Sequence, residues 1–254
     1  MSVQGQSDYT NTGAERLAGL LRSPDGMNPA QEKDGYMDAL GDRDALGPHQ
    51  SQQAFGRKAL PLVYERIWRP LTARVFFGLA GPRAATEREM TMEMLDVSAG
   101  DRVLDVGCGP GNYTRRLAQD APNGLTVGID ASAAMVSAAT KRENSPNIVY
   151  ARADASALPF RDETFDVVCC VGVIHMTSNP MDALDEMVRV LAPGGCLAIV
   201  ATCARKGVAT HVRKGITVFS REALTGALID HGLVDVGQQV IRRGQFVSAR
   251  RQEV

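Results

Sequence analysis

The feature that most constrains this chain is an alternation of short β-rich runs with helical runs, which begins after the turn-forming string Ser98-Ala99-Gly100-Asp101. Consecutive parallel strands need a crossover, usually a helix, and these crossovers cover both faces of the sheet. The pattern predicts strands at 102–106, 125–129, 148–152, 165–171, 196–202, 234–239 and 245–249. It predicts helices at 112–119, 131–141 and 180–191. We therefore expect an α/β fold with a doubly wound, Rossmann-like sheet.

The last two predicted strands are connected differently from the others. They are joined through Arg242-Arg243-Gly244, and this connection is too short for a parallel crossover. The two strands must therefore pair as an antiparallel hairpin, which closes an otherwise parallel sheet.

The 254 residues are enough for one well-packed α/β domain with an accessory part. Residues 1–50 are rich in Gly, Ser, Gln, Asn, Asp and Pro, and only Ala14 to Leu21 shows helical spacing of apolar side chains, so we expect the segment to be largely flexible. Apolar residues at helical spacing over 59–77, interrupted by Pro70, and a second helix at 83–95 predict a helical lid over 51–97. Residues 98–254 then form the α/β domain.

Composition excludes several classes of partner. Lys and Arg number 28 against 29 Asp and Glu, a net charge of -1, so no bulk positive field draws the chain to nucleic acid. No apolar run approaches the roughly 20 residues of a membrane-spanning helix, and the first residues lack the pattern of a signal peptide. We expect a cytoplasmic protein, a monomer or homodimer, without stable membrane insertion. The five cysteines lack metal or redox spacing, which predicts reduced core thiols and no metal site.

A glycine loop joins the first predicted strand to the first helix. In Gly107-Cys108-Gly109-Pro110-Gly111 glycine recurs at alternate positions, so a ligand could contact bare backbone there. We expect side chains at Gly107 or Gly109 to occupy space that a ligand needs. The helix that follows offers unpaired N–H groups to an anionic group. A tight strand-to-helix turn would produce the same pattern, so the loop alone does not decide between the two.

Acidic residues follow the next two predicted strands. Asp130 is placed where a carboxylate can accept both hydroxyls of a ribose, and Asp154 where one can contact the amino group of an adenine. Either residue alone could be a helix N-cap. Because the carboxyl ends of parallel strands meet at one edge, the two together favour a nucleotide site above the glycine loop.

Asp105 distinguishes between candidate nucleotides. A negative charge just before the loop would repel a pyrophosphate above it, whereas it would attract a ligand with an α-ammonium group. S-adenosylmethionine is such a ligand. Asp105 is therefore predicted to hold its amine, directly or through water.

These blocks, in this order, resemble the class I S-adenosylmethionine-dependent methyltransferases. The 104–111 segment resembles their motif I, Gly128-Ile129-Asp130 with Met135 their motif II, and 186–195 the corner before their fifth strand. Within that superfamily the chain is most similar to the branch related to the ubiquinone/menaquinone C-methyltransferases, a type 11 methyltransferase domain, over about residues 60–250. The resemblance implies a seven-stranded sheet with an antiparallel last strand. It also implies a set of cofactor-binding residues: Asp105, Gly107, Cys108, Gly109, Asp130, Ala131, Met135, Asp154, Ala155 and Val171.

The acceptor side is less determined. Methyl transfer is an in-line displacement that mainly requires alignment in a shielded site, and a base is needed only for a protonated nucleophile. His175, just past the fourth strand, is the candidate base, with a positioning role as the alternative. Tyr64 and Trp68 in the lid, with His175, are candidate acceptor contacts, and an apolar lid suits a small, lipid-like or quinone-like acceptor. These aromatic residues could equally serve only to pack the lid onto the sheet.

A basic insertion at 203–219 carries Arg205, Lys206, Arg213 and Lys214. We interpret it as a solvated loop, with an anionic acceptor as the alternative. Two other functions stay open at this stage. One is an NAD-dependent oxidoreductase, which Asp105 and the closing hairpin disfavour, and the other is an inactive methyltransferase-like binding module.

Overall fold

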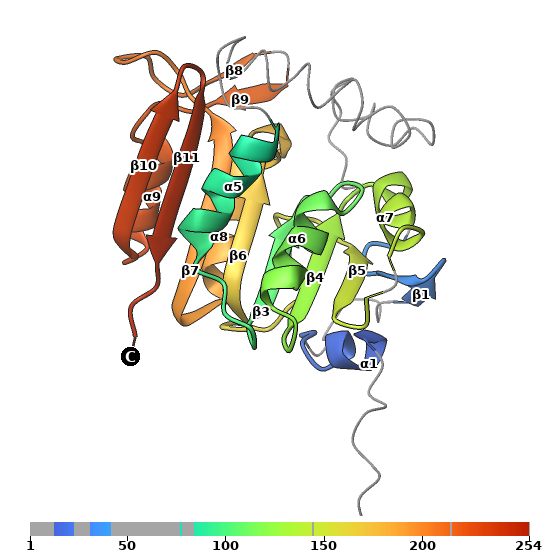
Figure 1. The fold of residues 1–254 in the computed structure, drawn as a ribbon. Helices are drawn as coiled ribbons and strands as arrows, with labels where there is room; N and C mark the ends of the chain where they lie inside the picture. Colours follow the sequence, from blue (N-terminus) through green and yellow to red (C-terminus); the bar gives the residue numbers. More distant parts are fainter. Residues whose placement is uncertain are drawn as a thin grey trace, which may run out of the picture.

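The computed structural model describes residues 13–22, 31–41, 77, 84–143, 145–213 and 215–253. The helix predicted at 59–77, apart from its last residue, and the proposed break at Pro70 lie outside the described residues, as does most of the 51–97 lid. The remaining fold surrounds one large sheet (Figure 1).

The sheet has nine strands in the order β1-β2-β5-β4-β3-β6-β7-β11-β10. The seven strands of the predicted pattern are β3 (Arg102–Val106), β4 (Leu125–Asp130), β5 (Ile148–Arg152), β6 (Phe165–Val171), β7 (Leu191–Thr202), β10 (Val234–Ile241) and β11 (Gly244–Arg250). Strands β3 to β7 pair in parallel, and β11 pairs antiparallel with both β7 and β10. The predicted doubly wound sheet with an antiparallel last strand is confirmed.

Helices cover the two faces of the sheet. One face carries α1 (Gly13–Ala18), α8 (Pro180–Val190) and α9 (Ala223–Asp230); the other carries α5 (Ala84–Leu95), α6 (Asn112–Asp120) and α7 (Ala133–Thr140). In Figure 1, α5 and α6 lie in front of the sheet. Both faces are therefore buried, as expected for parallel strands joined by helices.

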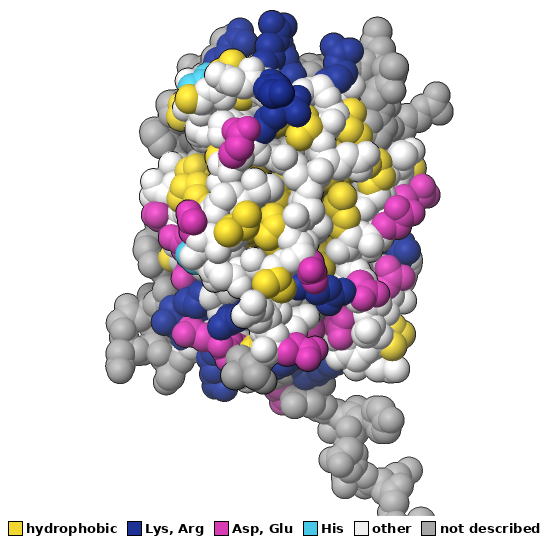
Figure 2. Space-filling view, turned by 90° about the vertical axis from the view of Figure 1, so that its left-hand side faces the viewer, with side chains coloured by type: hydrophobic (Ala, Val, Ile, Leu, Met, Phe, Trp, Pro, Cys, Tyr) yellow, Lys and Arg dark blue, Asp and Glu magenta, His cyan; other side chains and the backbone are white. Residues whose placement is uncertain are grey.

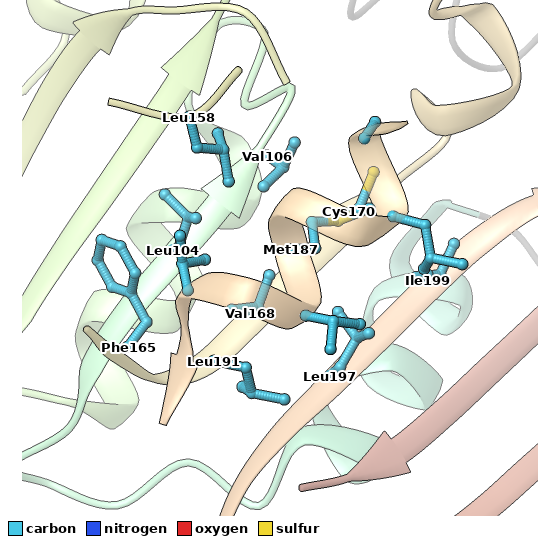
Figure 3. Packing of buried hydrophobic residues seen from close by; sticks show 14 of the residues in the cluster. Leu104, Val106, Leu158, Phe165, Val168, Cys170, Met187, Leu191, Leu197 and Ile199 are labelled. Carbon is cyan, nitrogen blue, oxygen red and sulfur yellow. The ribbon is translucent and has the colours of Figure 1, made fainter. Parts of the chain in front are cut away.

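Alternate side chains of each strand pack into different clusters. Leu104 of β3 lies in register with Val168 of β6, which lies beside Leu197 of β7, and all three are fully buried against Met187 of α8 (Figure 3). Each such burial contributes about 1.5–3 kcal/mol. The residue that follows Leu104 is Asp105, so its side chain points to the opposite face, toward α6.

The N-terminal residues differ from the expected flexible segment where the structure describes them. Residues 31–38 form a hairpin, β1 (Gln31–Lys33) and β2 (Tyr36–Asp38), and β2 adds a parallel strand beside β5. Helix α1 buries Leu17 completely in the main core. Short strands of three residues carry no periodic signal, so their long-range pairing could not be predicted from the local pattern.

The basic insertion is also more structured than predicted. It forms a second, two-stranded sheet from β8 (His211–Arg213) and β9 (Ile216–Val218), and β9 packs against the 3₁₀ helix η3 (Ile174–Met176) that follows β6. The five cysteines are all buried free thiols, as predicted. Among the described residues, no helix has the length and apolarity needed to cross a membrane.

Candidate functional site at the carboxyl edge of the sheet

The glycine loop after β3 is held in a conformation that disfavours side chains. Gly107, Gly109 and Gly111 have φ values of 77°, 54° and 85°. A Cβ added at Gly109 would meet no atom within 4 Å, whereas one at Gly107 would lie 2.3 Å from a methyl carbon of Val173. Gly109 therefore presents bare backbone to open space, which a ligand loop requires. At Gly107 the space is instead occupied by Val173, so close packing explains that glycine.

Asp130 ends β4 directly beside this loop. Its Oδ2 accepts a hydrogen bond from the Gly109 N–H at 3.0 Å, and its Oδ1 accepts one from the Ser132 N–H at 2.8 Å. A carboxylate has about four lone-pair sites, so each oxygen keeps one for another donor. This remaining pair of acceptors matches the two hydroxyls of a ribose.

Burial and hydrogen bonding oppose one another at Asp130. Burial raises its pKa from 3.8 to about 6, although the N–H groups of Ser132 and Gly109 act to lower the pKa. The carboxyl is therefore mostly ionised at pH 7 and ready to accept hydrogen bonds.

The pKa of Cys108 depends on its burial and on the carboxylates near the loop. Burial, then the nearby carboxylates of Asp130 and Asp105, raise the pKa of the Cys108 thiol well above its ordinary value. The thiol is buried beside Val136 and Tyr150, on the α7 side. Cys108 would thus offer a ligand its backbone, while its side chain belongs to the core.

Asp105 lies deeper than the other two predicted carboxylates. It is 2% exposed, and the Thr114 hydroxyl of α6 donates to its Oδ2 at 2.7 Å. This contact ties the acidic residue of β3 to the helix that starts at the glycine loop. Asp105 was predicted to hold a ligand amine either directly or through a water molecule. Its burial favours contact through water.

Asp154 and Ala155 lie beside Asp130 because β4 and β5 are parallel neighbours. Asp130 is in register with Arg152, and the Ala153 N–H donates to the Asp130 carbonyl oxygen at 3.2 Å. The Asp154 Oδ1 accepts the Ser156 N–H at 2.9 Å, so this residue also stabilises its own turn. The sheet thus brings the two predicted acidic residues to one edge.

Two residues that were not predicted as site residues, Ser132 and Arg152, hold the segment that follows Asp130. Ser132 is the N-cap of α7 and accepts the Met135 N–H, while Met135 itself is buried. Arg152 donates to the Ala131 carbonyl at 3.2 Å and pairs with Asp38 at 3.3 Å. The N-cap could have been found from the sequence, since Ser precedes the helical run. The ion pair of Arg152 with Asp38 could not, because it depends on the unexpected β2.

The predicted acceptor side lies at the end of β6, which is the neighbour of β3 in the sheet. Val171 ends β6 and is half-buried, and His175 on η3 is 3% exposed. Burial lowers the pKa of His175 to about 4, so the ring is neutral at pH 7. A neutral ring can accept a proton, but a conjugate acid of this strength makes it a weak base. The burial favours the positioning role over that of a general base.

The aromatic residues assigned to the lid are only partly described. Tyr64 and Trp68 lie outside the described residues. Phe77 is buried and stacks on Phe246 with 5.5 Å between ring centroids. Tyr36, which precedes the predicted lid, lies on β2 and packs against α7. Both Phe77 and Tyr36 therefore belong to the packed interior.

Known proteins share the part of the chain that contains these residues. Residues 104–199 match the family model of the methyltransferase domain. The chain is 36% identical over 118 residues to the ubiquinone/menaquinone biosynthesis C-methyltransferase of Ectopseudomonas mendocina, covering 44% of this chain and 46% of that protein. It is 32% identical over 164 residues to phthiotriol/phenolphthiotriol dimycocerosates methyltransferase 1 of Mycobacterium ulcerans, covering 53% and 59%. The chain thus spans about half the length of these relatives.

Solved structures share the fold. The [4+2]-cyclase SpnF matches with a TM-score of 0.63 and 21% identity, over 84% of this chain and 100% of that one. A SAM-dependent methyltransferase from Aquifex aeolicus matches with a TM-score of 0.57 and 23% identity, over 75% and 97%. Residues 104–199 thus match a methyltransferase domain, as predicted, and the chain shares the fold of these structures.

Proposed function

We propose that this chain transfers a methyl group from S-adenosylmethionine to a small, lipid-like or quinone-like acceptor. The observation that carries the proposal is the Asp130 carboxylate, which keeps one acceptor site on each oxygen next to the open backbone of Gly109. Relatives named for quinone and dimycocerosate methylation support the acceptor class.

Each residue of the edge has a role in this proposal. Asp130 accepts the two ribose hydroxyls, Asp154 with Ala155 contacts the adenine, and the buried Asp105 provides the negative charge that attracts the ligand's amine. When bound, the cofactor supplies an electrophilic methyl group on a sulfonium sulfur. Val171 contacts the cofactor at the end of β6, and the neutral His175 beyond it orients the acceptor and excludes water.

The proposal predicts methyl transfer that depends on Asp130. The chain is incubated with methyl-labelled S-adenosylmethionine and an apolar metabolite extract, and label in the extract and S-adenosylhomocysteine are both measured. We expect equal amounts of the two products, and at least a tenfold lower rate for Asp130→Ala at low cofactor concentration, because hydrogen bonds to a charged group contribute about 1.5–3 kcal/mol each.

Two other outcomes would contradict the proposal. The likeness to a [4+2]-cyclase shows that the fold also serves a protein named for different chemistry. Cofactor binding without label transfer to any extract would therefore favour that class, or a binding module, over a methyltransferase. Tight binding of NAD in place of S-adenosylhomocysteine would favour the oxidoreductase.

A further inference from the structure

A pocket lies at the carboxyl end of β7, next to the site described above. It has a volume of about 530 Å³, within the range of roughly 300–1,000 Å³ found for small-molecule sites. Thr202 and Cys203, at the end of β7, are buried in its floor. Because β9 forms one side of the pocket and packs against η3, the pocket adjoins the helix that carries His175.

Three hydrogen bonds to backbone carbonyl groups fix the elements around the pocket. The Thr202 hydroxyl donates to the Thr217 carbonyl at 2.6 Å, and the Ala204 N–H donates to the Phe219 carbonyl at 2.7 Å. On the other side, the Cys203 N–H donates to the Arg243 carbonyl at 2.6 Å. The β8–β9 hairpin and the β10–β11 turn are thus both fixed to the end of β7, and the pocket does not depend on a loose loop.

The pocket has an apolar wall and a basic rim. The apolar wall consists of Val208, Ile216 and Val218, and Val208 is 42% exposed. The basic rim consists of Arg205, Arg213 and Arg243, all exposed. A ligand with both apolar and anionic parts could contact the apolar wall and the basic rim at the same time.

The charge around the pocket is mainly basic, although the Glu222 carboxylate lies near the thiol of Cys203. No Asp or Glu occurs between Cys203 and Arg221, although the whole chain carries a net charge of -1. Among the ion pairs formed by described residues, none involves the basic rim. Figure 2 shows Lys and Arg side chains gathered at the upper end of the molecule, where Figure 1 places the β8–β9 hairpin. The solvated-loop interpretation does not account for such a preformed pocket.

We propose that this pocket binds the anionic end of an amphipathic acceptor, with a carboxylate or phosphate on the basic rim and an apolar body along the apolar wall. That the ligand is the methyl acceptor rests on the proposed function; the binding of an amphipathic anion does not. Guanidinium groups suit both anions because they donate parallel N–H bonds.

Calorimetry with short probes tests the chemistry of the pocket. Octanoate and octyl phosphate carry both required parts, octanol lacks the charge, and acetate and inorganic phosphate lack the apolar body. We expect both octyl anions to bind at least tenfold more tightly than octanol, acetate or phosphate. Equal binding of inorganic phosphate and octyl phosphate would indicate an adventitious ion only, and equal binding of octanol would indicate an unspecific apolar groove; either result overturns the proposal.

Two matched pairs of variants locate the binding. Val208→Asp places a negative charge in the pocket, whereas Val212→Asp makes the same change at a residue that is 67% exposed and does not line it. Arg243→Gln removes a positive charge from the basic rim. Arg142→Gln removes a positive charge away from the pocket, at the exposed end of α7. We expect Val208→Asp and Arg243→Gln to weaken octanoate binding at least tenfold and the two controls less than threefold. Equal losses within either pair would contradict the pocket as the site.

Two further titrations separate this inference from its alternatives. Vesicles of phosphatidylglycerol test a membrane surface: binding to vesicles through Arg243, without binding of either octyl anion, would overturn the proposal. S-adenosylhomocysteine, titrated into the wild type and the same variants, should bind all of them equally. Failure of S-adenosylhomocysteine to bind the wild type would refute the proposed function, while the octanoate result would still decide on the pocket.

Discussion

At the level of single residues, burial favours the protonated form of the Asp130 carboxyl, whereas the proposed contact with a ribose requires the ionised form. Two backbone N–H groups hold its oxygens, yet burial raises its pKa to about 6. Below that pH the ligand-free protein carries a protonated carboxyl, which has less charge and one fewer acceptor. A ribose that needs the ionised form must then displace the proton when it binds.

The first prediction concerns the pH dependence of cofactor binding. The affinity for S-adenosylhomocysteine should be constant between pH 7 and 8 and fall as the pH is lowered through about 6. The loss should approach tenfold per pH unit, since one proton is released on binding. Isothermal titration calorimetry in buffers of different ionisation enthalpy measures both the affinity and the proton.

Asp130→Asn provides the control because it keeps the size of the side chain but cannot ionise. This variant should bind at least tenfold more weakly at pH 7.5 and show no loss of affinity through pH 6. A slope equal to that of the wild type would mean that another group titrates, and that Asp130 does not contact the ribose.

At the level of elements, the turn between β10 and β11 depends on a glycine for packing. A Cβ at Gly244 would lie 2.2 Å from Cε1 of Phe77, whose ring stacks on Phe246. We predict that Gly244→Ala lowers the free energy of unfolding by about 1–3 kcal/mol, the usual cost of overpacking a core. Urea unfolding followed by circular dichroism measures this difference.

Gly226→Ala is the matched control for that substitution. Gly226 lies within α9, and a Cβ there would meet no atom within 4 Å outside its own helix. Alanine should therefore stabilise the protein by roughly 0.5–1 kcal/mol, because it favours the helix. If Gly244→Ala instead raised the stability as Gly226→Ala does, the close packing of Phe77 on this turn would be wrong.

Elements with a strong local pattern were predictable, and elements with long-range partners were not. The strands from β3 to β6 and the antiparallel closing hairpin follow from apolar runs, helical spacing and a short connection. The β1–β2 hairpin depends on β5, more than a hundred residues away, and on Arg152 pairing with Asp38. Nothing within residues 31–38 indicates that partner.

The candidate site was predictable to a similar extent. Asp130 and Asp154 could be placed at one edge because parallel strands end together. The burial of Asp105, the Val173 side chain at Gly107 and the pocket at the end of β7 could not, since each depends on contacts between separate elements.

At the level of the whole molecule, two sites adjoin along one edge of the sheet. The proposed cofactor site uses the ends of β3, β4 and β5, and the proposed anion pocket uses the end of β7. Strand β6, followed by η3 and His175, lies between them. This order would bring a donor bound on one side toward an acceptor bound on the other.

The most direct test of the central claim is a crystal structure of the chain with S-adenosylhomocysteine. The account predicts the nucleoside above Gly109, with both ribose hydroxyls donating to Asp130 and the adenine beside Asp154. A nucleoside bound elsewhere, or one at this edge whose ribose makes no contact with Asp130, would contradict it.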